Sequence, residues 1–155
     1  MGMNKWISYG VIGVAYFLLF ACKSQHIVQG KYNFTGGVYE QKYNTMPGIG
    51  KASGKGAPFA TSLYIYQATK LSQLDSLSGS FCSRIQGDLI ATIQSNAMGQ
   101  FNAQLKPGVY SVFVRAENAY YIPFFSGTAW TALFEIKADT STNLDIIVRV
   151  NSNIQ

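Results

Sequence analysis

The feature that most constrains this chain is a series of short runs in which hydrophobic residues occupy every second position. A period of two places alternate side chains on opposite faces of an extended strand. In residues 100–105, for example, the alternation places Phe101, Ala103 and Leu105 on one face. No segment has a convincing helical period, and no spacing suits alternating strands and helices. The chain is therefore expected to be all-β.

Turn-forming residues divide the chain after residue 31 into eight such runs, and from residue 89 onward turns recur about every 8–12 residues. The runs are Tyr32–Tyr43, Thr61–Ala68, Leu89–Gln94, Gln100–Leu105, Val109–Ala116, Tyr120–Phe125, Thr131–Lys137 and Asn143–Val150. Seven or eight short strands predict an antiparallel β-sandwich. Gly36-Gly37 predicts a bulge or a close backbone approach in the first strand. Residues 44–58 are expected to form neither strand nor helix, and residues 69–84 a long loop or a single helical turn.

Pro107-Gly108 is expected to be a type II turn that joins two strands as a hairpin. Proline presets φ at the first central position of such a turn, and glycine allows the positive φ of the second. Phe101, Leu105 and Tyr110 are expected to be buried on the strands that flank the turn, with the Tyr110 hydroxyl close to it.

The strand expected at residues 61–68 also has two distinct faces. Leu63 and Ile65 lie on the face that is expected to contact the core. Tyr64 and Tyr66 lie on the opposite face, and Tyr64→Ala is expected to destabilise the domain much less than Tyr110→Ala if that face is solvated.

The N-terminus has the three parts of an export signal. A positive end at residues 1–5 precedes a largely apolar stretch at residues 6–20, and polar residues follow Leu19-Phe20-Ala21-Cys22. The apolar stretch is shorter than the ~20 residues that span a bilayer. The four closing residues resemble a lipobox, in which Cys22 is acylated on sulfur and becomes the new N-terminus. An uncleaved membrane anchor with an incidental cysteine is the alternative.

The chain is accordingly divided into three parts. Residues 1–21 are expected to be a lipoprotein signal peptide, residues 22–31 the lipidated Cys22 with a polar tether, and residues 32–155 the β-sandwich domain. With Cys22 acylated, Cys82 has no partner for an intramolecular disulfide. Cys82 is either a reactive or intermolecularly paired thiol or a small, partly buried residue, and its neighbours favour the latter.

Residues 92–117 resemble the carboxypeptidase regulatory-like domain, a small sandwich of transthyretin type. The matching residues are a polar turn at Ser95–Gly99, then Gly99-Gln100-Phe101, then Leu105-Lys106-Pro107-Gly108-Val109-Tyr110-Ser111-Val112. Met46-Pro47-Gly48 and the strand Ser62–Gln67 are similar to an earlier part of lipid-anchored bacterial members. The resemblance implies a sandwich that acts as an accessory module or as a lone lipoprotein domain. Residues 120–125 are aromatic where anchored relatives often have a polar loop, so no ligand is carried over for them.

The sequence lacks the residues that catalysis would need. The one histidine, His26, lies in the tether, and acylation of Cys22 leaves one thiol, whereas a catalytic metal site takes about three protein ligands. The seven acidic residues form no close pair in the sequence. The net charge of +5 is scattered, which argues against nucleic-acid binding. We therefore expect no catalytic residue, no metal and no cofactor.

One region is crowded with aromatic residues that are candidates for a binding patch. They are Tyr120, Tyr121, Phe124, Phe125 and Trp130. Such residues either pack in the core of a sandwich or form an exposed surface for a protein or a glycan. Their exposure as a flat platform would favour a glycan, whereas their burial beside an open apolar sheet face would favour a protein partner.

These observations predict a non-catalytic, lipid-anchored module of the cell envelope that docks onto an outer-membrane protein assembly. Carbohydrate or peptidoglycan binding is the alternative. Lys23 follows the cysteine where an inner-membrane retention signal would have aspartate, and no acidic run follows to mark surface export. The expected location is therefore the periplasmic face of the outer membrane, which the protein contacts through its N-terminal lipid.

Overall fold

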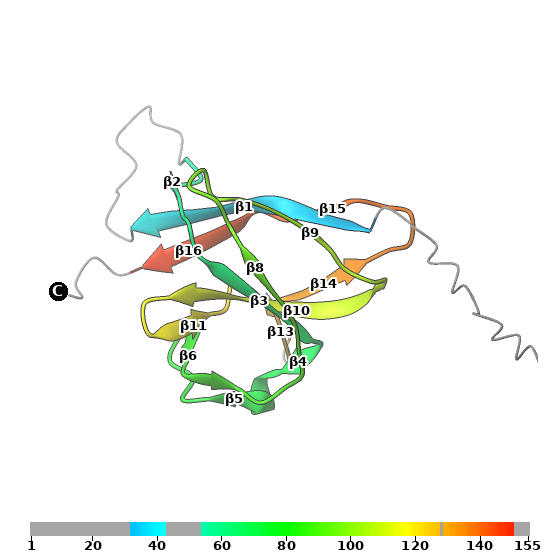
Figure 1. The fold of residues 1–155 in the computed structure, drawn as a ribbon. Helices are drawn as coiled ribbons and strands as arrows, with labels where there is room; N and C mark the ends of the chain where they lie inside the picture. The colour runs from blue at the N-terminus through cyan, green and yellow to red at the C-terminus, as the bar shows by residue number, and fades with distance from the viewer. Residues whose placement is uncertain (1–31, 43–53, 128, 151–155) are drawn as a thin grey trace, which may run out of the picture.

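The computed structural model describes residues 32–42, 54–127 and 129–150, and within them the only helix is the 3-10 turn η1 (Leu71–Gln73). Seven of the described strands have four or more residues. They are β1 (Asn33–Lys42), β3 (Ser62–Gln67), β8 (Leu89–Gln94), β9 (Gln100–Gln104), β10 (Gly108–Ala116), β14 (Leu133–Ile136) and β16 (Ile146–Val150). Each overlaps a run that the alternation predicts, so the expected all-β class is confirmed (Figure 1).

The first sheet is centred on β1. Along one side, β9 and β2 (Ala57–Pro58) pair with β1 in the antiparallel sense. The expectation that residues 44–58 contain no strand was therefore wrong at their C-terminal end. Along the other side, β15 (Thr142–Asn143) and β16 run parallel to β1, and the expectation of an entirely antiparallel sandwich was wrong here. The chain enters β15 from the second sheet and not through a hairpin from β1. The direction of β15 is therefore not forced to be antiparallel to that of β1.

The second sheet has the order β6-β11-β10-β3-β8, with β14 paired to the first half of β10. Its added short strands are β6 (Phe81–Cys82) and β11 (Ala119–Tyr121). The two sheets pack face to face around an aromatic cluster, in which the Phe34 ring lies 5.0 Å from that of Phe101 and 4.5 Å from that of Phe134. This packing is that of a β-sandwich.

The connections that flank β9 pass from one sheet to the other. A turn at residues 95–99 links β8 in the second sheet to β9 in the first, and Pro107 precedes the return to β10 in the second. The prediction of a hairpin at Pro107-Gly108 was therefore wrong. The burial predictions were right, because Phe101, Leu105 and Tyr110 are 5%, 6% and 9% exposed. The Tyr110 hydroxyl donates a hydrogen bond to the Lys106 carbonyl oxygen at 2.9 Å, which ties the strand to this connection.

A third layer of short strands covers the outer face of the second sheet. Its strands are β4 (Thr69–Lys70), β5 (Leu74–Asp75), β7 (Arg84–Ile85), β12 (Phe125–Ser126) and β13 (Trp130–Thr131). In Figure 1, β4, β5 and β13 lie beneath β3 and β10. Residues 69–84 thus contain the expected helical turn but also strands. Tyr66 is 8% exposed and its ring meets that of Phe113 edge-on at 5.6 Å. A solvated face was therefore a wrong expectation for Tyr66, which this layer buries, whereas Tyr64 is half-buried.

Buried polar groups join the third layer to the second sheet. The Ser111 hydroxyl accepts a hydrogen bond from the Thr69 backbone N–H at 2.9 Å and donates one to the Thr131 carbonyl oxygen at 2.7 Å. Cys82 lies in the same region at 1% exposure, and burial raises the pKa of its thiol to about 11. The interpretation of Cys82 as a buried, unreactive residue is consistent with both values, since the thiolate is the reactive form.

Within the part of the chain that the structure describes, no helix is long and apolar enough to cross a membrane. The predicted signal peptide, Cys22 and the tether lie outside the described residues, as does Met46-Pro47-Gly48.

Candidate functional site

The predicted aromatic patch is divided between different parts of the fold. Tyr120 is half-buried, and its ring lies 5.2 Å from that of Tyr64 and 5.2 Å from the Arg115 guanidinium carbon. Tyr121 is 4% exposed and its ring packs at 5.2 Å from that of Phe81. Adjacent residues of a strand face opposite sides. The two tyrosines therefore belong to different surfaces.

Of the other three aromatic residues, Phe125 lies in β12, Trp130 lies in β13 and Phe124 directly precedes β12. Phe124 is half-buried, whereas Phe125 is 44% exposed. Trp130 is half-buried, and the Lys70 ammonium lies 5.2 Å from its ring. The five predicted residues thus range from buried to exposed, and the rings of Tyr120, Tyr121 and Trp130 contact residues outside the group.

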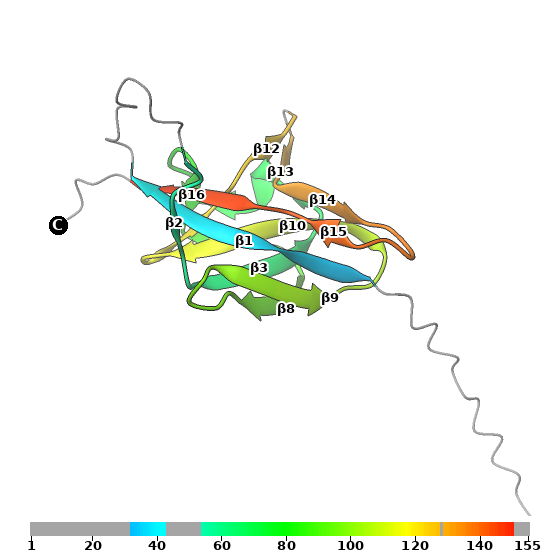
Figure 2. The ribbon, with the colours of Figure 1, turned by 90° about the horizontal axis from the view of Figure 1, so that it is seen from above.

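β8 forms one edge of the second sheet, and β6 lies at the other end of the strand order. Among the described strands β8 pairs with β3 alone, and it lies at the margin of the molecule in Figure 2. Its sequence, Leu-Ile-Ala-Thr-Ile-Gln, contains neither a charged residue nor proline. Leu89 and Ile90 are 50% and 45% exposed, and Ile90 lies at the bulge in the pairing with β3.

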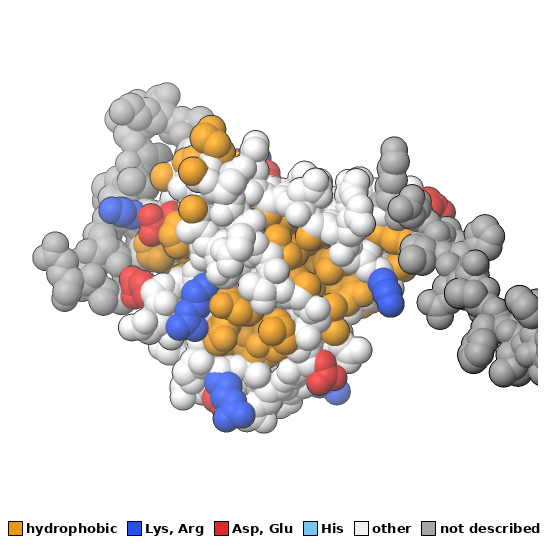
Figure 3. All heavy atoms as spheres, in the orientation of Figure 1, with side chains coloured by type: hydrophobic (Ala, Val, Ile, Leu, Met, Phe, Trp, Pro, Cys, Tyr) orange, Lys and Arg blue, Asp and Glu red, His pale blue; other side chains and the backbone are white. Residues whose placement is uncertain are grey.

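Apolar surface continues from this edge onto the neighbouring strands. Tyr64 pairs with Thr92 of β8, and Tyr120 contacts Tyr64, so Tyr120 is the one predicted patch residue that reaches this surface. Figure 3 shows hydrophobic side chains gathered in the middle of this face, where β8 and β3 run in Figure 1. We call this the β8 edge surface and define it by Leu89, Ile90, Thr92, Tyr64 and Tyr120.

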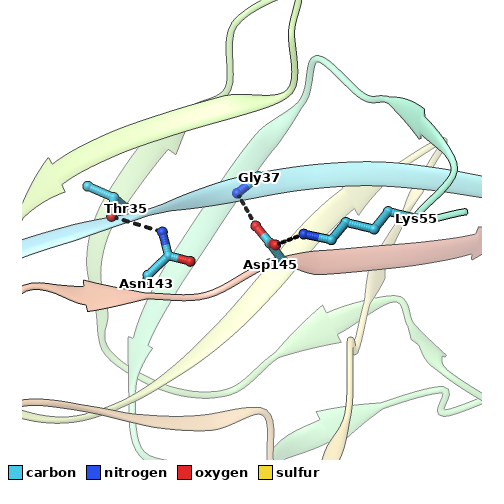
Figure 4. Close-up of polar contacts among 5 residues, drawn as sticks. All are labelled: Thr35, Gly37, Lys55, Asn143 and Asp145. Atoms are coloured by element: carbon cyan, nitrogen blue, oxygen red, sulfur yellow. Dashed lines mark hydrogen bonds and ion pairs between the residues drawn. The ribbon is translucent and has the colours of Figure 1, made fainter.

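A second candidate site is a polar groove of about 460 Å³ on the outer face of the first sheet. It is lined by Thr35, Gly36, Gly37, Tyr39, Asn96, Gln100, Phe101, Asn102, Asn143 and Asp145. The pairing of β1 with β9 and with the segment that precedes β16 brings these residues together. Figure 4 shows the Asp145 carboxylate between the Gly37 backbone and the Lys55 side chain, with Asn143 beside Thr35.

The polar contacts of the groove hold Asp145 in place. One carboxylate oxygen accepts a hydrogen bond from the Gly37 backbone N–H at 3.0 Å, and the other accepts one from the Lys55 ammonium. This hydrogen bond and the charge of Asp145 raise the pKa of Lys55. The Asn143 amide donates to the Thr35 hydroxyl at 3.3 Å. The groups that face the groove are therefore hydrogen-bonding groups with one neutralised ion pair.

Neither site was identified from the sequence, although the groove left a signal there. Gln100 and Asn102 alternate with the apolar face of β9, and Gly36-Gly37 marks the place where the chain is crowded. Within the described segments, no group of three or more histidine, cysteine or acidic side chains is placed to hold a metal ion.

Comparison of the chain with models of protein families finds no match, and a search of curated proteins also finds none.

Proposed function

We propose that this protein is a non-catalytic, lipid-anchored module of the cell envelope that docks onto an outer-membrane protein assembly through the β8 edge surface. The observation that carries the proposal is an edge strand without charge or proline, on which Leu89 and Ile90 are exposed. Exposed edges present unpaired backbone N–H and carbonyl groups. Proteins usually have charged residues or proline on such edges, which prevent another chain from pairing with them. An extended segment of a partner would satisfy these groups by adding a strand beside β8.

The same proposal includes the anchor and the type of sandwich. The pattern Leu19-Phe20-Ala21-Cys22 supports acylation of Cys22, and Lys23 supports the periplasmic face of the outer membrane. The series from Leu105 to Val112 supports a sandwich of the transthyretin-like, carboxypeptidase regulatory-like type.

Ile90→Lys tests the docking site. We expect the variant to recover at least tenfold less partner than the wild type when it is purified from detergent-solubilised membranes, because a charged side chain on an edge opposes strand addition. Quantitative mass spectrometry of the copurified proteins measures the difference. Leu77→Lys is the matched control, since Leu77 is 46% exposed but lies outside β8.

The control variant should recover the same partner in the same amount as the wild type. Equal recovery by Ile90→Lys would contradict docking at β8. A partner that proves to be a second copy of this chain would contradict docking onto an outer-membrane assembly.

Cys22→Ala tests the anchor. We expect the wild type to incorporate a fatty-acid analogue during growth and the variant to incorporate none, because the alanine side chain has no thiol to acylate. In-gel detection of the label measures the difference, with Cys82→Ala as a control that keeps the lipobox intact. Equal labelling of the wild type and Cys22→Ala would exclude this anchor.

A further inference from the structure

Gly37 makes room for the Tyr39 ring in the polar groove. On the outer face of the first sheet, Thr35 of β1 pairs with Asn102 of β9, and Gly37 pairs with Gln100. The Tyr39 ring folds over Gly37, because a Cβ added at Gly37 would lie 2.6 Å from the Tyr39 hydroxyl oxygen and 2.7 Å from a ring carbon. The absence of a side chain at Gly37 thus lets the Tyr39 ring lie across the sheet, and the depression of the groove is lined by this ring and by amides.

The amides around this depression offer both donors and acceptors. The side chains of Gln100 and Asn102 are exposed and have no hydrogen-bond partner within the described residues. The carbonyl oxygen of the Asn96 side chain accepts hydrogen bonds from the Met98 and Gln100 backbone N–H groups, each at 2.9 Å, which orients its NH₂ group as a donor. A primary amide can donate two hydrogen bonds and accept two, so this set matches a ligand whose groups do both. Hydroxyl groups have this property.

The charges of the groove select against ionic ligands. Among the residues that the structure describes, Asp145 is the only charged one that lines the groove, and Lys55 is bonded to Asp145. An anionic ligand would face this carboxylate, and a cationic ligand would have to displace Lys55. Removing a charge from water without pairing it is costly. The groove therefore suits an uncharged ligand.

We infer that the polar groove binds an uncharged carbohydrate. Hydroxyl groups of the sugar bond to the amides of Gln100, Asn102 and Asn96, and a sugar ring lies against Tyr39. The volume of about 460 Å³ lies within the range of small-molecule sites. The groove lies on the first sheet and the β8 edge surface on the second, so this inference does not depend on the docking proposal.

The test is isothermal titration calorimetry of the full chain, purified in detergent, with maltoheptaose, cellohexaose and triacetylchitotriose as neutral probes. Heparin is the anionic probe. The groove variant is Gln100→Ala/Asn102→Ala, measured with both single variants. Gln104→Ala is the matched control, because Gln104 is an exposed amide of β9 that pairs with Asn33, outside the groove.

We expect at least one neutral probe to bind with a dissociation constant of about 1 mM or tighter, which corresponds to about 4 kcal/mol. The double variant should bind it at least tenfold more weakly, and Gln104→Ala within twofold of the wild type. Circular dichroism should show the same fold for all variants, since the three side chains are exposed. The inference is overturned by no binding of any neutral probe, by tighter binding of heparin, or by unchanged affinity in the double variant.

Discussion

Phe34→Ala is expected to lower the free energy of unfolding by about 3–5 kcal/mol, the usual cost of truncating a buried phenylalanine. Phe34 has no exposed surface, and its ring joins Phe101 of the first sheet to Phe134 of the second. Its removal leaves a cavity where the two sheets meet. The loss is a large share of the ~5–15 kcal/mol that stabilises a domain, so the variant should unfold at a much lower urea concentration.

Phe125→Ala makes the same chemical change at the surface, where Phe125 is 44% exposed. We expect it to cost about 0.5 kcal/mol or less. Urea denaturation followed by circular dichroism compares the two variants. Similar midpoints for both would contradict the position of the aromatic cluster between the sheets.

Gly36→Ala is expected to destabilise the domain by about 3 kcal/mol, because a new side chain has no room there. A Cβ at Gly36 would overlap the Leu144 carbonyl group and lie 2.8 Å from the Phe101 ring. The Leu144 carbonyl belongs to the backbone between β15 and β16, so it cannot rotate away as a side chain would. The variant must instead separate β1 from the strands that run parallel to it.

Gly54→Ala is the control, since nothing lies within 4 Å of a Cβ at Gly54. Its stability should match that of the wild type or exceed it slightly, because alanine reduces the freedom of the unfolded chain. Thermal melts of both variants measure the difference. A melting temperature for Gly36→Ala equal to that of Gly54→Ala would show that Leu144 does not pass over Gly36.

The positions of the strands could be predicted because alternation is a local property. The position of a residue within an alternating run indicates the face of the strand on which it lies. The runs that form β9 and β10 were therefore predicted with Phe101 and Tyr110 on the buried side. The expected strand at residues 120–125 is instead divided into β11 and β12 around Pro123. Proline lacks the N–H that a continuous ladder requires.

The candidate sites were harder to predict, because they combine residues that are distant in the sequence. Aromatic residues that cluster at 120–130 suggested one patch, but the alternation of β11 sends Tyr120 and Tyr121 to opposite sides. The groove combines Asn96, Asn102 and Asp145, which become neighbours through the pairing of β1 with β9 and the passage of the chain into β16. No local sequence pattern indicates which strands pair with β1.

The sequence by itself determined the all-β class, the approximate positions of the longer strands and the buried sides of β3 and β9. It also placed the crowded backbone at Gly36, because glycine inside a strand indicates a close approach. These properties depend on neighbours along the chain. Only the tertiary structure decided that β16 runs parallel to β1 and that Tyr66 is buried. The direction of β16 depends on how the chain passes from the second sheet to the first. The burial of Tyr66 on the outer face of the second sheet depends on whether a distant segment, here residues 69–85, covers that face.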